Sequence, residues 1–155
     1  CYMTAGTAAA LEIDHHRVKL ITARSPFSVG AWHVLPFETE HDAADPVGFL
    51  MKSGNEKLLF LTDSYFCRYT FPGLTHIMIE CNYALDILLE NDLPAVHKKR
   101  VIQSHFSLAN VKTFLQANNL NRVRDIHLLH LSRDNADPAR FKSEIEQLTG
   151  KPVHV

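Results

Sequence analysis

The sequence predicts one layered domain of the α/β or α+β class, and two observations lead to this prediction. Strand-like segments dominate the first half of the chain, whereas strands and helices alternate in the second half, an order typical of a sheet covered by helices. The length of 155 residues and the hydrophobic content of 46% are sufficient for a domain with a substantial core. We therefore expect residues 1–155 to form a single domain.

Alternating or continuous apolar residues mark the strands. Strands are predicted at residues 17–22, 32–39, 47–52, 57–62, 76–80, 124–131 and 153–155. Pro36 indicates an edge position or a bulge, and the turn residues 53–56 predict a hairpin between the strands on either side. The apolar run 58–61 predicts a strand buried on both faces. Proline and glycine within residues 25–30 predict a loop.

The helices are marked by residues typical of helix ends. Helices are predicted at residues 8–12, 82–90, 108–117 and 138–148, with a further helical stretch that starts at Pro94. Thr7, Asn82 and Ser107 are expected to cap the first three of these helices through their side chains. Pro138 suits the first turn of the last helix, and Gly150 suits its end.

The composition excludes several classes of protein. The formal net charge is −1, so no overall basic field advertises nucleic-acid binding, and any such contact would be local. No apolar run approaches the ~18 residues of a membrane span. Cys1, Cys67 and Cys81 are odd in number and lack C-x-x-C spacing, which argues against a disulfide framework and favours a reducing compartment, so we expect a cytoplasmic protein. Because the chain begins at Cys1 rather than methionine, it is expected to be processed, trimmed or a fragment, and a fragment is the favoured interpretation.

Three apolar stretches end in polar residues that suit a metal ion, namely His41, Asp63 and His130. A carboxylate at the end of a buried strand is costly unless a charge or several donors compensate it, and a metal ion is an economical partner. There are ordinary alternatives, because the acids of loop 41–45 can bind backbone amides and Asp63 can cap a turn. His127 and His130 are three residues apart on one strand and face opposite ways, so only His130 is expected in a site.

A histidine just before a predicted helix suggests contact with phosphate. Helix N-termini attract phosphate, so His105 and Ser107 suit this role, although a capped loop with an incidental histidine is the alternative. The acid Glu80 ends a strand, but together with Asn82 it is equally typical of a simple helix start. No G-x-S-x-G elbow, P-loop or G-x-G-x-x-G motif occurs, and the cysteines lack a nucleophile signature. The remaining chemistry is that of histidine and aspartate, which points to a metal.

Five segments, taken in order, resemble the C-terminal part of the metallo-β-lactamase superfamily. HDAADPVGF (41–49) is similar to the motif of the third histidine, and LLFLTDS (58–64) to the T-D-T-G motif that carries the bridging aspartate. MIECN (78–82), SHFSLANV (104–111) and IHLLHLSRDNADP (126–138) resemble the E-S-N, G-H-L-S-N and L-x-H-L-S-x-x-N-N-x-P segments of one branch. The combination resembles the YycJ/VicX-like branch, near the tRNase Z and phosphodiesterase members.

The resemblance implies an α+β, four-layer αββα fold, incomplete at its N-terminus, and two divalent metal ions, zinc or manganese. By position, His41 would bind one metal, Asp63 would bridge both, and His130 would bind the other. His105 and Asp63 would be catalytic, with His105 acting on the phosphate or the leaving group. The implied substrate-binding residues are Asn82, Ser107 and Ser132. The implied reaction is the hydrolysis of a phosphodiester, in nucleic acid, by water that two metals activate.

The sequence also departs from the family pattern. The H-x-H-x-D-H motif, which supplies four ligands in the family, does not occur in the 155 residues, residues 14–16 have the wrong spacing to replace it, and in the family it would lie upstream of Cys1. Tyr65 replaces the glycine of T-D-T-G, Tyr83 a frequent histidine, and Phe106 a leucine. We therefore expect the 155 residues alone to bind metal poorly and to be inactive. Through an uncovered sheet edge they are expected to associate as an oligomer or to be held by another piece of the same protein.

Two other functions stay open at this point. One is a hydrolase of the same fold that acts on a small ester, thioester or lactam, and the other is a metal-free, non-catalytic domain that binds a partner or nucleic acid. The set of His41, Asp63 and His130 favours an enzyme, because a binding module does not need all three, and the His105 motif favours a phosphodiester substrate.

Overall fold

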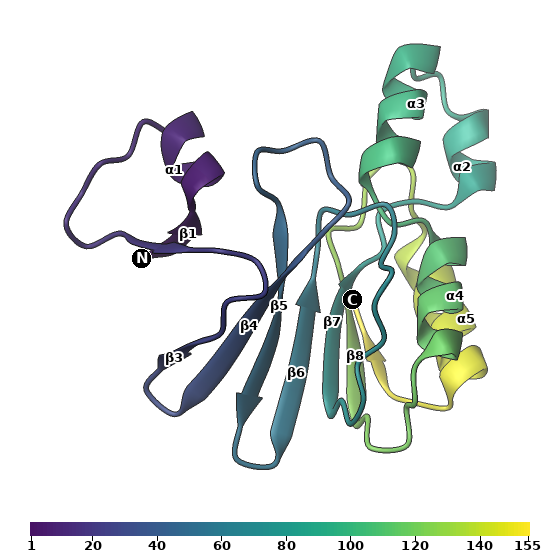
Figure 1. Cartoon of the computed structure of the whole chain (residues 1–155). Helices are drawn as coiled ribbons and strands as arrows, with labels where there is room; N and C mark the ends of the chain where they lie inside the picture. Colours follow the sequence, from purple (N-terminus) through teal and green to yellow (C-terminus); the bar gives the residue numbers. More distant parts are fainter.

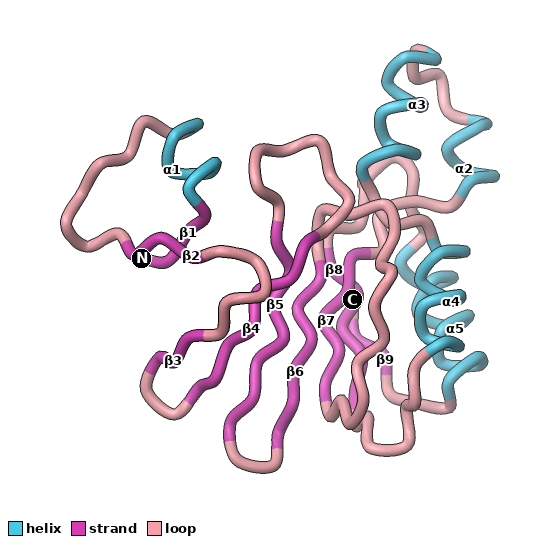
Figure 2. The backbone as a smooth tube through the Cα atoms, in the orientation of Figure 1, coloured by secondary structure: helices cyan, strands magenta, loops and turns pink.

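A computed structural model describes all 155 residues, and its centre is a seven-stranded mixed sheet (Figures 1 and 2). The strands lie side by side in chain order: β3 (Phe27–Val29), β4 (Trp32–Glu38), β5 (Val47–Ser53), β6 (Glu56–Leu61), β7 (His76–Glu80), β8 (Asp125–Leu129) and β9 (Val153–His154). Strands β3 to β6 pair antiparallel, whereas β6 to β9 pair parallel. Consequently β6, β7 and β8 all end at the same edge of the sheet.

The antiparallel half follows from local signals. The predicted hairpin is confirmed, because β5 and β6 pair from Phe49↔Phe60 down to Ser53↔Glu56. Pro36 pairs with β5 on one side and lies beyond the short β3 on the other, so its missing N–H removes no ladder bond on that side. The predicted loop at residues 25–30 is wrong, since β3 forms there against β4. Gly30, with φ 57°, turns the chain so that β3 pairs with the strand that follows it, and this pairing supplies the hydrogen bonds of β3.

Helices cover one face of the sheet. Helices α4 (Leu108–Ala117) and α5 (Pro138–Thr149) pack there, and Figure 1 shows α2 (Leu85–Glu90) and α3 (Ala95–Ser104) beyond the edge at which β6 to β8 end. The core lies between this face and the helices, and it includes Leu59, Leu61, Ile77, Ile79, Ile126, Leu128, Val111, Leu115, Phe141 and Ile145.

Only one face of β6 is fully buried, so the prediction of a strand buried on both faces is wrong. Leu59 and Leu61 have no exposed area, whereas Leu58 and Phe60, which point to the opposite face, stay partly exposed. The physical reason is that the described residues place helices on one face only. Of the four layers implied by the resemblance, these 155 residues form one sheet and the helical layer that covers it.

A small unit lies beside the main sheet. In it β1 (Tyr2–Thr4) pairs parallel with β2 (Lys19–Ile21), and α1 (Ala5–Ala10) connects them in part (Figure 2). The predicted cap at Thr7 is wrong, because α1 begins earlier and the Thr4 hydroxyl accepts a hydrogen bond from the Thr7 backbone N–H at 3.3 Å.

Of the other predicted helix caps, two are confirmed and one is wrong. Ser107 caps α4 by accepting from the Asn110 backbone N–H at 3.1 Å, and Gly150 ends α5 in the left-handed conformation at φ 64°, as predicted. The cap predicted at Asn82 is wrong, because α2 starts at Leu85 without a side-chain cap. None of the helices combines the length and the hydrophobicity that a membrane crossing needs.

Candidate metal centre and active site

Four metal-ligating side chains come together where the parallel strands end. Asp63 follows β6, Glu80 is the last residue of β7, His130 follows β8, and His105 ends α3. Their donor atoms lie within 4.8 Å of one another. This edge is where open parallel sheets usually place their ligands, because loops from neighbouring strands meet there.

The Asp63 carboxylate lies near three histidines at once. Its Oδ1 atom lies 3.2 Å from Nδ1 of His130, 3.9 Å from Nδ1 of His105 and 4.0 Å from Nε2 of His41. The structure therefore brings together the four side chains that the sequence singled out for metal binding and catalysis. Their roles as ligands and catalytic groups stay a prediction.

Glu80 also belongs to the group, although its sequence pattern did not single it out as a site residue. Its side chain has no exposed area, and its Oε1 lies 2.6 Å from Nδ1 of His105 and 3.0 Å from Nδ1 of His130. Its Oε2 accepts backbone N–H groups of Ser64 at 3.1 Å and Phe106 at 3.4 Å. The available signal was an acid at the end of a buried strand, the same signal that singled out Asp63.

We predict that the Glu80 carboxylate keeps His105 protonated to a higher pH. The hydrogen bond to Glu80 raises the pKa of His105 above its ordinary value of 6.5. Since the folded pKa is the higher one, this pairing stabilises the fold fully below pH 6.5 and stops contributing as the pH rises through the folded pKa. In metal-free protein, an NMR titration of the His105 ring should show this raised midpoint, and Glu80→Gln should lower it. An unchanged midpoint in Glu80→Gln would contradict the assignment.

Two of the converging residues sit in an uncommon backbone conformation. Asp63 has φ 53° and His130 has φ 52°, both in the left-handed region. For a residue other than glycine this costs on the order of 1–3 kcal/mol, and such outliers cluster at functional sites because the turn aims a side chain. Asp and His both adopt this region more often than most other residues do.

The backbone of His130 is held by Asn82. The Asn82 side-chain amide donates to the His130 carbonyl at 2.8 Å, and the Ser132 backbone N–H donates to the Asn82 carbonyl at 2.9 Å. The Ser132 hydroxyl accepts from the Asn135 amide at 3.0 Å. Asn82 and Ser132, like the capping residue Ser107, thus make internal hydrogen bonds, and their predicted contact with substrate stays a prediction.

His41 and His127 differ in their relation to the group. His41 is largely buried, and its Nδ1 accepts the Ala43 backbone N–H at 3.1 Å, so in a neutral ring Nε2 carries the proton. Binding a metal through Nε2 would require this ring to move its proton and give up the Ala43 contact. His127 stacks on His154 with ring centroids 4.6 Å apart, away from the group, as the strand alternation predicts.

The donor set fits a zinc or manganese ion in its chemistry. Imidazole nitrogens and carboxylate oxygens are suitable ligands for both metals, and one Asp63 oxygen lies close to three imidazoles. The buried charge of Glu80 is already engaged by two backbone N–H groups and by His105. This arrangement leaves Asp63 as the carboxylate best placed for a metal and Glu80 as a group that orients histidines.

Comparison with known proteins finds solved structures with a similar fold and one protein with a similar sequence. No protein-family model matches the sequence. The chain is 26% identical over 112 residues to the exodeoxyribonuclease YycJ of Bacillus anthracis, a match that covers 68% of this chain and 42% of that protein. The structure is similar to the metallo-β-lactamase fold protein YhfI of Bacillus subtilis, with a TM-score of 0.71 at 11% identity, over 99% of this chain and 60% of that one.

A third similar structure is zinc-bound PqqB of Methylobacterium extorquens, with a TM-score of 0.65 at 13% identity, over 99% of this chain and 62% of that one. The chain thus spans 42% of the length of YycJ and about 60% of the length of these two structures. The chain has the metallo-β-lactamase fold, and in sequence it is similar to the YycJ branch of that superfamily.

Proposed function

We propose that this chain forms part of the active site of a metal-dependent hydrolase that cleaves phosphodiesters in nucleic acid. The observation that carries the proposal is the Asp63 oxygen, which lies within 4.0 Å of the imidazoles of His41, His105 and His130 at the end of three parallel strands. A carboxylate among imidazoles at this edge is an arrangement that two nearby cations can share.

His41, Asp63 and His130 are the residues that would hold the metal ions, with Asp63 as the common ligand. When bound, two divalent ions supply an activated water and neutralise charge on the phosphoryl oxygens. The residues of this chain then orient the substrate and handle protons. Glu80 acts on them indirectly, since it holds Nδ1 of His105 at 2.6 Å and lies 3.0 Å from Nδ1 of His130.

His105 is proposed as the residue that handles a proton at the leaving oxygen. Glu80 engages Nδ1, so Nε2 is the ring nitrogen that can serve the substrate. The raised pKa of His105 favours the imidazolium form, which can donate a proton to a leaving alkoxide. Positioning by a buried carboxylate, itself held by two backbone N–H groups, keeps the ring in one orientation.

Basic residues on the helix that leads to His105 support an anionic polymer as substrate. Helix α3 carries the cluster His97, Lys98, Lys99 and Arg100, and a cavity of about 380 Å³ is lined by His97, Arg100, Val101 and His105. Arg100 also pairs with Asp42 at 3.0 Å, which joins α3 to the loop that carries His41. A small ester, thioester or lactam would not need a cluster of basic side chains, so the cluster favours a phosphodiester. The sequence similarity to an exodeoxyribonuclease supports the same choice.

We infer in addition that the protein works in a reducing compartment, the cytoplasm, because its three cysteines are unpaired and Cys81 is buried.

Partly exposed apolar residues on the uncovered face of the sheet, such as Leu58 and Phe60, lead us to expect the 155-residue chain to self-associate when it is alone.

The test compares the 155-residue chain with a longer chain that includes the residues encoded upstream of Cys1, if these contain an H-x-H-x-D-H motif. We expect the 155 residues alone to bind zinc weakly, to be inactive and to scatter light as an oligomer. The longer chain should bind two ions in calorimetry and hydrolyse bis(p-nitrophenyl) phosphate and single-stranded DNA.

Other outcomes would contradict parts of this proposal. A 155-residue monomer that binds two zinc ions tightly and cleaves phosphodiesters would show that these residues supply all the ligands. A longer chain that hydrolyses a lactam or thioester but no phosphodiester would establish the alternative hydrolase. A longer chain that binds no metal would leave the non-catalytic binding domain as the function.

A further inference from the structure

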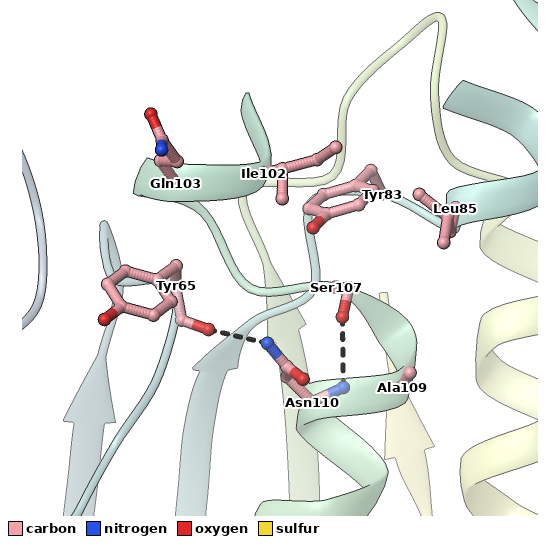
Figure 3. A pocket seen from close by; sticks show the side chains of 8 residues that line it. All are labelled: Tyr65, Tyr83, Leu85, Ile102, Gln103, Ser107, Ala109 and Asn110. Carbon is pink, nitrogen blue, oxygen red and sulfur yellow. Dashed lines mark hydrogen bonds between the residues drawn. The ribbon is translucent and has the colours of Figure 1, made fainter. Parts of the chain in front are cut away.

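A pocket of about 630 Å³ is lined by residues that lie close along the chain to those of the candidate active site (Figure 3). Two of its lining residues follow site residues directly along the chain: Tyr65 is two places after Asp63, and Ser107 is two places after His105. Its roof is the end of α3, the helix that His105 terminates. A molecule with a group at Asp63 and His105 can therefore extend into this pocket.

The pocket is held together by internal hydrogen bonds. The Asn110 side-chain amide donates to the Tyr65 carbonyl at 2.8 Å, and the Leu108 backbone N–H donates to the Tyr83 carbonyl at 2.8 Å. Tyr83 is itself buried, with 3% of its area exposed. These contacts tie the loops after β6 and β7 to the start of α4, so the walls are formed before any ligand arrives.

The walls combine flat aromatic surface with amide groups. Figure 3 shows Tyr65 on one side of the pocket and Tyr83 with Leu85 on the other, while Ile102 and Gln103 lie above. The volume falls within the roughly 300–1,000 Å³ of ligand pockets, which are typically apolar with a few polar groups. The Gln103 amide can both donate and accept hydrogen bonds at the rim. A planar ring with polar edges can use both the aromatic wall and the amide, whereas an alkyl chain can use only the apolar wall.

We propose that this pocket binds a nucleobase next to the scissile phosphate, with Tyr65 as its stacking surface. The inference rests on the proposed function, because the phosphoryl group at Asp63 and His105 directs the neighbouring nucleotide toward the pocket. Stacking of a base on an aromatic side chain tolerates all four bases, so the pocket would set the position of the substrate rather than its sequence.

The test uses the metal-free 155-residue chain in EDTA, followed by amide NMR. The probes are deoxyadenosine and, as its matched control without a base, deoxyribose. Deoxyadenosine should shift the resonances of Tyr65, Tyr83 and Ala109, whereas deoxyribose should not. Tyr65→Ala should weaken deoxyadenosine binding on the order of 10- to 100-fold. Tyr65→Phe should retain most of the affinity, because it keeps the ring.

Phe66→Ala is the matched control variant. Phe66 is 44% exposed against 40% for Tyr65, but it does not line the pocket, so this change should leave binding intact. Absence of shifts in the pocket, an unaffected Tyr65→Ala, or equally tight binding of benzyl alcohol would each overturn the assignment. Because these probes carry no phosphate and need no metal, base binding without phosphodiester cleavage would refute the proposed function and keep the pocket, and the reverse result would do the opposite.

Discussion

Replacing Asp63 is expected to abolish both metal loading and phosphodiester hydrolysis. Its Oδ1 lies near three imidazoles, so both ions would lose their common ligand. The loss of turnover should be at least roughly 10²–10³-fold, the effect of removing one group that stabilises the transition state. Asp63→Ala tests this, but Asp63→Asn is the sharper variant, because asparagine also tolerates the φ of 53° at this position and alanine does not.

Asp45→Asn is the control for this change. Asp45 also has a left-handed backbone, with φ 55°, but its carboxylate accepts the Gly6 backbone N–H instead of facing the histidines. Metal content measured by atomic absorption and hydrolysis of bis(p-nitrophenyl) phosphate should be normal in Asp45→Asn. Full metal content and activity in Asp63→Asn would show that the carboxylate is not the shared ligand.

Replacing His105 by alanine is expected to slow turnover while metal loading stays normal. The ring is held by Glu80 at 2.6 Å rather than by the proposed ligand set, so its loss removes a proton carrier and not a ligand. The expected decrease in kcat is on the order of 10²–10⁴-fold, typical of a general acid or base. The measurement is kcat on bis(p-nitrophenyl) phosphate, with the metal content determined on the same sample.

His127→Ala provides the comparison, since this histidine stacks on His154 outside the group and should leave kcat unchanged. Glu80→Gln should fall between the two, because it leaves the His105 ring present but loosely oriented. Equal loss of metal in His105→Ala and Asp63→Asn would refute the division of roles, and would make His105 a ligand, which its position within 4.8 Å of the other donors allows.

Much of the candidate site was predictable from the sequence because its residues follow strands. His41, Asp63 and His130 each end an apolar stretch, and a metal ion that compensates a carboxylate at a strand end would bring these distant residues together. His105 was found from its place before the helix that Ser107 caps. These signals are local: a run of apolar residues, a polar residue at its end, and a capping side chain.

The sequence alone determined the hairpin of β5 and β6, the Ser107 cap of α4, the Gly150 end of α5, and the set of His41, Asp63 and His130 as candidate ligands. Only the tertiary structure decided the role of Glu80, whose partner His105 is 25 residues away, and that of Asn82, which reaches across 48 residues to His130. Local sequence encodes the ends of strands and helices through backbone hydrogen bonding. The partner of a buried charge or amide, in contrast, is set by which loops the sheet brings together, and no local pattern records that choice.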